Sequence, residues 1–191
     1  MPRAVYSGAP MLSWQRIARR IRVPLGFLFA AAYIWLARPT AISIAAGSAI
    51  VLAGLVVRAL ASGHVKKNEV LTMSGPYAYT RNPLYFGSLV LSAGFVIVSR
   101  SWWVALIAAI IFFGIYLPVI RAEEEFLRNR FPEFAAYASN VPRLFPRLRT
   151  PQIGAGGFSW DLYWKHREYN AALGAALMIA ALVIKAWRFA R

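Results

Sequence analysis

The chain contains no cysteine and little acid or histidine. Its 191 residues include 7 Asp and Glu, 22 Lys and Arg, and 2 His. The missing cysteine excludes disulfides, thiolate chemistry and prenylation of a C-terminal cysteine. The two histidines, His64 and His166, lie far apart in the sequence, so no metal-ligand spacing occurs and we expect no metal site.

The net charge of +15 is compatible with nucleic acid or with an anionic membrane as the partner. Hydrophobic residues make up 59% of the chain, which is more than an ordinary soluble domain of this size contains. These residues fall in blocks, and basic residues flank the blocks at positions where they would meet anionic headgroups. We therefore expect membrane lipids as partners, and no nucleic acid.

The apolar blocks predict an all-α integral membrane protein. A helix needs roughly 20 residues to cross about 30 Å of hydrocarbon. We expect one membrane domain, 1–191, with about five transmembrane helices. The predicted spans cover about 23–37, 41–61, 84–99, 102–120 and 171–187.

Local signals support these boundaries. Thr40 and Ser101 stand before the second and fourth blocks as expected N-cap residues. Asn82 precedes Pro83, a pair that predicts an N-cap followed by proline at the first helical position. Pro118 is predicted to kink or end the fourth block.

Basic residues predict the orientation of the chain. They concentrate in the basic interfacial arm 1–22 and in the polar segments 62–83 and 121–170, which favours N-in and C-out topology. Both polar segments would then lie on the cytoplasmic side, in the inner membrane if the protein is bacterial. Arg58, inside the second block, either extends its charge to the membrane surface or lines a pocket.

The first polar segment ends in SGPYAYTRNPLYFG, residues 74–87. The pair Gly75 and Pro76 marks a turn, and the residue before Pro83 is pushed away from helical geometry. The loop therefore ends at a helix N-terminus, whose free N–H groups favour an anionic group. Tyrosines at 77, 79 and 85 add flat faces and hydroxyls, although such tyrosines also occur in the aromatic belts of membrane proteins.

The second polar segment begins RAEEEFLRNRFPEFAAYASNVPRLFP, residues 121–146. Its three adjacent glutamates, 123–125, need nearby cations, and Arg121 and Arg128 lie within helical reach of Glu125 and Glu124. A solvated, salt-bridged helix end would explain the charges alone. Two segments of aromatics, prolines and charges on one membrane face favour a joint cytoplasmic pocket built between helices.

Both segments resemble the isoprenylcysteine carboxyl methyltransferase and phospholipid methyltransferase group. GPYAYTRNPLYFG is similar to the group's G-x-Y-x-x-x-R-H-P-x-Y motif, and EEEFLRNRFPEFAAYASNVPRLFP is similar to its E-E-x-x-L helix end followed by V-P-R-x-x-P. The resemblance covers about residues 45–147. It implies S-adenosyl-L-methionine as methyl donor, bound at the cytoplasmic face. The implied donor contacts are Glu69, Val70, Leu71, Thr72, Tyr77, Asn82, Pro83, Leu84, Tyr85, and Glu123 or Glu124.

The resemblance also implies methyl transfer to a lipophilic small molecule or lipid. Arg121 or Arg81 would position an acceptor carboxylate, as in isoprenylcysteine, while Glu124 would hold the donor or take a proton from an amine. N-methylation of a phospholipid amine is one alternative, and a non-enzymatic transporter subunit or scaffold is another. The group usually has His where this chain has Asn82, which cannot become cationic.

Overall fold

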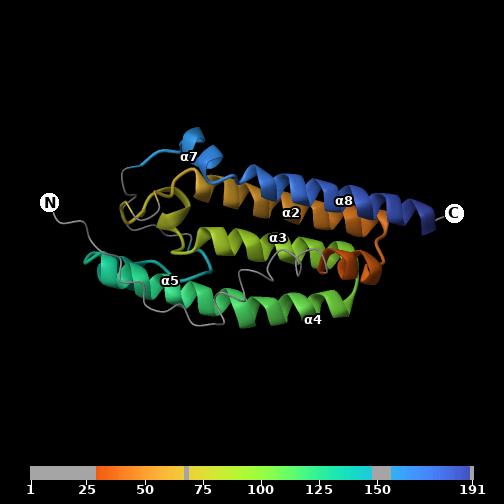
Figure 1. Cartoon of the computed structure of the whole chain (residues 1–191), viewed down its shortest axis with the longest axis horizontal. Coiled ribbons are helices and arrows are strands. Elements are labelled where there is room, and N and C mark those ends of the chain that lie inside the picture. Colours follow the sequence, from red (N-terminus) through yellow and green to blue (C-terminus); the bar gives the residue numbers. More distant parts are fainter. Residues whose placement is uncertain (1–28, 67–68, 148–155, 190–191) are drawn as a thin grey trace, which may run out of the picture. The chain divides into compact units, whose positions relative to one another are not determined.

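The computed structural model describes residues 29–66, 69–147 and 156–189, and within these ranges it contains helices and no strands. Residues 29–36 form a short helix that belongs to a separate unit, in which the rings of Phe29 and Tyr33 stand 6.3 Å apart. The remaining elements belong to a second unit (Figure 1). The predicted arm 1–22 and the start of the first apolar block, 23–28, lie outside the described residues.

Three helices of the described chain are long and apolar enough to cross a membrane. They are α2 (Ala41–Ser62), the continuous stretch Trp102–Arg130, and α8 (Tyr169–Phe189). Helix α3 (Pro83–Ser99) is apolar but has only 17 residues, or about 25 Å at 1.5 Å per residue. The protein is therefore an all-helical protein of membrane type, while the five-span count stays a prediction.

Glycines bring α2 and α3 into close contact. Gly47 and Gly54 on α2 face Gly94 and Gly87 on α3. A Cβ atom at Gly47 would lie 2.6 Å from the carbonyl oxygen of Gly94, and one at Gly54 would lie 2.8 Å from that of Gly87. The backbones approach closely because no side chain separates them, as small residues allow in membrane helix pairs. Helix α8 also packs on α2.

The predicted caps differ in their side-chain bonds. Thr40 caps α2 in a reciprocal pair, since its Oγ1 accepts from Ser43 N at 3.2 Å and Ser43 Oγ accepts from Thr40 N at 2.9 Å. Pro83 is the first residue of α3, as predicted, but the side chain of Asn82 makes no capping bond. Ser101 also precedes its helix without a side-chain cap.

Pro118 does not end the fourth block. Helix α4 (Trp102–Ile111) passes through a π-helical turn, η2 (Phe112–Tyr116), into α5 (Leu117–Arg130). Proline lacks the N–H that would bond the carbonyl of Gly114, and its ring clashes with that carbonyl in a regular helix. The wider turn just before Pro118 absorbs this conflict, so the helix continues beyond the apolar residues to Arg130.

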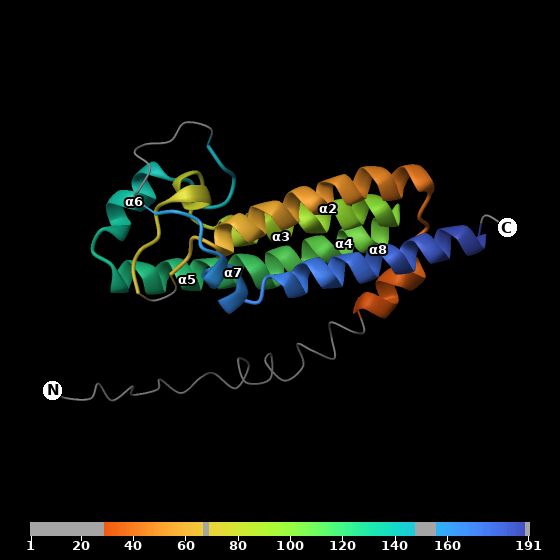
Figure 2. The same ribbon diagram turned by 90° about the horizontal axis from the view of Figure 1, so that it is seen from above.

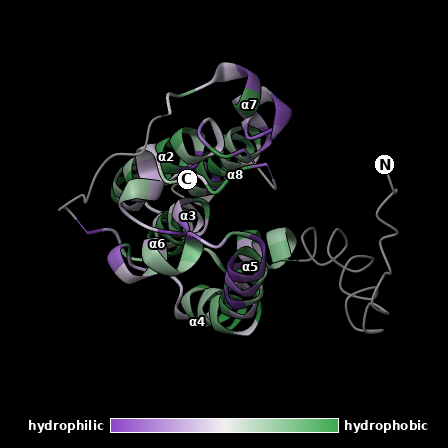
Figure 3. Cartoon of the chain, turned by 90° about the vertical axis from the view of Figure 1, so that its left-hand side faces the viewer, coloured by the Kyte–Doolittle hydropathy of each residue, from purple (hydrophilic) through white to green (hydrophobic). Residues whose placement is uncertain are grey.

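The polar elements gather at one end of the second unit (Figures 1 and 2). The elements there are η1 (Gly75–Ala78), the end of α5, α6 (Phe134–Asn140) and α7 (Trp160–Lys165). Figure 3 looks onto this end and shows hydrophilic residues on α5 and around α7. The turn between α3 and α4 lies at the opposite end. The two motif segments thus share one end of the apolar helices.

Candidate functional site

Glu124 on α5 joins the two motif segments. Its carboxylate is buried, with 5% of the residue exposed. The amide of Asn82 donates to Oε1 at 3.0 Å, and Nε of Arg143 donates to Oε2 at 2.9 Å. Nε of Arg81 lies 3.1 Å from Oε1 as an ion pair without the alignment of a hydrogen bond. The predicted partner of Glu124, Arg128, instead lies over the ring of Phe134.

Asn82 acts as a connector between segments. Besides Glu124, its Nδ2 donates to the backbone carbonyl of Arg143 at 2.9 Å. One amide group thereby uses both of its N–H donors on two different partners. The buried carboxylate of Glu124 is thus bound by the uncharged amide of Asn82 and by the two arginines Arg81 and Arg143.

The loop before α3 and the loop after α6 hold each other through backbone groups. Arg81 N donates to Pro142 O at 2.9 Å, and Arg147 N donates to Tyr79 O at 3.1 Å. The hydroxyl of Thr80 donates to Leu144 O at 2.9 Å. Because these bonds join residues about 60 positions apart, the loops form one structure.

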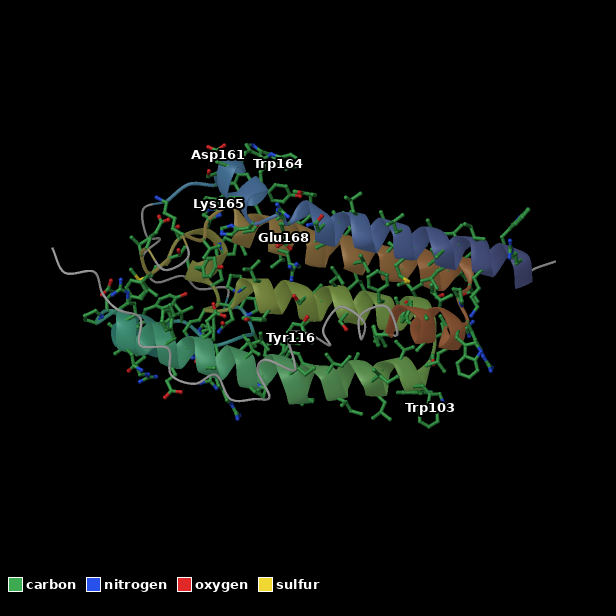
Figure 4. The ribbon with its side chains drawn as sticks, viewed as in Figure 1. Trp103, Tyr116, Asp161, Trp164, Lys165 and Glu168 are labelled. Atoms are coloured by element: carbon green, nitrogen blue, oxygen red, sulfur yellow. The ribbon has the colours of Figure 1, made fainter. Side chains whose placement is uncertain are left out.

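Glu123 lies beside Glu124 on α5 but faces a different environment. Glu123 is exposed, and its Oε2 accepts a 2.9 Å hydrogen bond from the hydroxyl of Tyr85. The ring of Tyr85 stands edge-on to Tyr116, with centroids 5.9 Å apart. Tyr116 lies in the π-helical turn η2 and is labelled in Figure 4. An accessible carboxylate and two tyrosine rings therefore meet next to the buried Glu124.

Tyr77 is the most strongly perturbed group of this region. Burial raises the pKa of its hydroxyl well above the ordinary range, and the nearby charge of Glu123 raises that pKa further. The carboxylate of Glu168 contributes to the pKa in the same direction. Tyr77 thus stays protonated at neutral pH and keeps its hydroxyl as a hydrogen-bond donor. Its own backbone carbonyl accepts from the hydroxyl of Tyr137 at 2.7 Å.

Other residues of the predicted site make different contacts. Glu69 and Val70 are exposed, and Glu69 pairs at 3.9 Å with Lys165. Leu71 packs on the cluster formed by Phe134, Tyr137 and Val141. Arg121 is exposed on α5.

Two further residues of the predicted site, Thr72 and Leu84, also form hydrogen bonds. Thr72 accepts a long 3.3 Å bond from Lys66 N through its hydroxyl. The backbone carbonyl of Leu84 accepts from Ser88 Oγ at 2.9 Å. These bonds stabilise the approach to α3 and its first turn.

Arg58 is held by polar partners within the described chain. Its Nε pairs with Oε1 of Glu168 at 2.5 Å, and its Nη1 donates to the hydroxyl of Ser88. Glu168 was absent from the predicted site, although a cation inside an apolar helix calls for a counter-ion. Only seven acids occur in the chain, and Glu168 stands three residues before the start of the last apolar block. That position was the signal available in the sequence.

The part of the sequence that builds the carboxylate and tyrosine cluster also matches a family model. Residues 42–133 match the model of the phospholipid methyltransferase family. This stretch, a little under half of the chain, is similar to the phospholipid methyltransferase family. The match includes Asn82, Tyr85, Glu123 and Glu124, and it ends before Arg143.

Two curated bacterial proteins are similar to the chain. The cobalt-zinc-cadmium resistance protein CzcN of Cupriavidus metallidurans is 34% identical over 122 residues, which are 64% of this chain and 55% of that protein. The nickel-cobalt-cadmium resistance protein NccN of Alcaligenes xylosoxydans xylosoxydans is 40% identical over 83 residues, which are 44% of this chain and 39% of that protein. The chain thus spans about half the length, or less, of these relatives. No solved structure matches it.

Proposed function

We propose that the protein transfers a methyl group from S-adenosyl-L-methionine to a lipophilic acceptor at the boundary between membrane and cytosol. The observation that supports this proposal most is the meeting of the two motif segments at Glu124. It lies within the stretch that matches the family and at the polar end of the apolar helices. The acceptor that we propose first is a carboxylate of the isoprenylcysteine type.

The side chains near Glu123 fit the donor chemically. S-adenosylmethionine supplies a methyl group that is electrophilic because it is bonded to a positively charged sulfur. The exposed Glu123 can bind an ammonium or ribose hydroxyl group by charge-assisted bonds. The rings of Tyr85 and Tyr116 offer faces that attract a cation. Backbone groups of Glu69, Val70, Leu71 and Thr72 complete the donor set that we propose from the resemblance.

We assign Glu124 a positioning role for the proposed donor-binding residues. Because its two oxygens bind Asn82, Arg81 and Arg143, we assign Glu124 the task of fixing the loop and α5 relative to each other. Rigid placement of reacting groups is worth roughly 7–11 kcal/mol in ideal cases. Arg81 is then unavailable for an acceptor carboxylate, while Arg121 remains accessible for one.

The chemistry of the acceptor decides what else the chain must do. Methylation of a carboxylate neutralises charge, so a site that excludes water favours it and no base is needed. Methylation of a phospholipid amine, the alternative acceptor, requires loss of a proton, which Glu123 can accept. In both cases the donor approaches from water and the apolar part of the acceptor from lipid.

Donor binding separates this proposal from a transporter subunit or scaffold. We expect Glu123→Gln and Tyr85→Ala each to weaken binding of S-adenosylmethionine by about tenfold, which corresponds to about 1.4 kcal/mol. Titration calorimetry of the purified protein in detergent, with the donor and its demethylated product, measures the affinity. Glu125→Gln, a change of the neighbouring exposed acid, serves as the matched control and should bind normally. No donor binding by the unmodified protein would refute the enzyme proposal, and unchanged binding in both variants would refute the site.

The names of the two relatives suggest a physiological setting. Both proteins are named for resistance to metal ions. We propose that this chain serves such resistance by methylating a membrane component, which changes the chemistry of the surface that metal ions meet.

A further inference from the structure

An ion pair lies where three apolar helices end. Arg58 stands four residues before the end of α2, and Glu168 directly precedes α8. The backbone carbonyl of Leu84 and the hydroxyl of Ser88, in the first turns of α3, both accept from Arg58 Nη1. Figure 4 labels Glu168 at the start of α8. The pair therefore sits at a shared end of these three apolar helices.

The turn before α8 directs Glu168 to this place. Arg167 adopts the left-handed conformation, with φ of 53°, which is uncommon for a residue other than glycine. Nδ1 of His166 lies 3.1 Å from the carbonyl oxygen of Ser62 at the end of α2. The preceding short helix α7 and this turn together hold the carboxylate against the guanidinium.

The ion pair uses only part of the guanidinium. Glu168 contacts Nε through one oxygen, whereas a carboxylate bound by an arginine fork would contact two nitrogens. Within the described parts of the chain, Nη2 of Arg58 makes no hydrogen bond. The arginine side chain remains 24% exposed and that of Glu168 is 11% exposed. The guanidinium can thus accept a second anionic group.

Stability alone gives a weak reason for this pair. Two charges taken out of water are often no better than apolar residues of equal volume, and ionisable groups inside apolar helices tend to mark ligand sites. The pair also adjoins the proposed donor site, because Leu84 is next to Tyr85 in the chain. The two arginines of the predicted site differ from Arg58, since Arg81 binds Glu124 and Arg121 is exposed on α5.

We propose that Arg58 is a subsite for the anionic group of a lipophilic ligand, and that Glu168 is an internal occupant which this ligand displaces. The ligand class is a carboxylate or phosphate carried on an apolar chain. The inference rests on the proposed function and deepens it, since such a ligand would place its head next to Tyr85. An internal occupant lowers the apparent affinity by reducing the fraction of molecules with a free subsite.

Binding of oleate and dodecyl phosphate to the purified full chain in detergent tests the proposal. We expect Arg58→Gln to weaken binding of both by about tenfold, and Glu168→Gln to strengthen it by about tenfold. Methyl oleate, which lacks the charge, should respond to neither change. Inorganic phosphate should bind no variant, because a free anion lacks the apolar chain. Arg130→Gln and Glu125→Gln, changes of exposed residues on α5, are the matched controls.

The opposite signs of the two effects distinguish a subsite from a structural pair. Weaker binding in both variants, or equal binding of oleate and methyl oleate, would overturn the proposal. If Glu168→Gln does not fold, Glu168→Asp still carries the test, because a shorter acid should release Arg58 in part and strengthen oleate binding. Affinity for S-adenosylmethionine is measured in the same samples. Normal donor binding with no oleate effect would reject the subsite alone, and absent donor binding would reject the proposed function.

Discussion

At the scale of single residues, two adjacent glutamates have different surroundings. Glu124 is buried and binds Asn82 and Arg143, whereas Glu123 is exposed and binds the hydroxyl of Tyr85. Neighbouring positions on a helix point about 100° apart, so one acid faces the interior and the next faces the edge. The first acid joins the two motif segments, and the second is open to solvent.

Removal of the charge of Glu124 should destabilise the junction of the two segments. Glu124→Gln leaves Arg81 and Arg143 close together without an anion between them. We expect a loss of about 2 kcal/mol, a value typical of hydrogen bonds to charged groups, and weaker donor binding as a consequence. Thermal unfolding in detergent measures the loss, with Glu125→Gln as control. Equal stability of the two variants would contradict the assigned role.

Tyr137 should give the junction a dependence on alkaline pH. Burial raises the pKa of its hydroxyl, an effect that the charge of Arg81 partly opposes. A raised pKa in the folded state means that this group stabilises the fold below the ordinary tyrosine pKa of about 10, and that the stabilisation falls as pH rises beyond that value.

The variant Tyr137→Phe tests this dependence. It loses the 2.7 Å bond to the carbonyl of Tyr77 and should cost about 1 kcal/mol near neutral pH. The difference from the unmodified protein should shrink at about pH 11, because the unmodified protein then loses the stabilisation as well. Denaturant unfolding at both pH values measures it. A difference that stays constant would show that Tyr137 does not titrate in this way.

At the scale of helices, the contact of α2 with α3 depends on the absence of side chains. A Cβ at Gly54 would lie 2.6 Å from the backbone nitrogen of Leu91, which cannot rotate away. Gly54→Ala should therefore separate the helices and cost about 1–3 kcal/mol, the usual range for overpacking. Gly174→Ala on α8 is the control, since no atom lies within 4 Å of its added carbon. Thermal unfolding of both variants in the same detergent compares them, and equal melting temperatures would contradict the expectation.

The continuous helix Trp102–Arg130 shows what a local pattern misses. Proline at 118 correctly indicates a conflict with regular helical bonding, but the chain resolves it with the π-turn Phe112–Tyr116. The residues beyond 120 are charged, so hydropathy stops there while the helix goes on. The length of an apolar run predicts the part of a helix that lipid can surround. The end of the helix itself depends on where its backbone hydrogen bonds stop.

At the scale of the whole molecule, the apolar blocks and the two motifs could be predicted because each is written in consecutive residues. The partners of Glu124 and Arg58 could not, because Arg143 and Glu168 come from loops whose paths depend on the folded chain. The lead-in Glu69–Thr72 was assigned by resemblance, and the structure separates its exposed Glu69 and Val70 from the packed Leu71. The N-in orientation still rests on the distribution of charge.

The contacts of Glu124 also determine how much of the chain must be synthesised before the junction of the two segments can form. The stretch that matches the family model ends at residue 133, yet Glu124 pairs with Arg143, and the loop before α3 bonds to Leu144 and Arg147. A nascent chain that ends at residue 133 already contains α2, α3 and the pair Asn82 and Glu124. It still lacks the contacts made by Arg143, Leu144 and Arg147. Assembly of the site is therefore a late event, completed by residues that lie downstream of the recognisable domain.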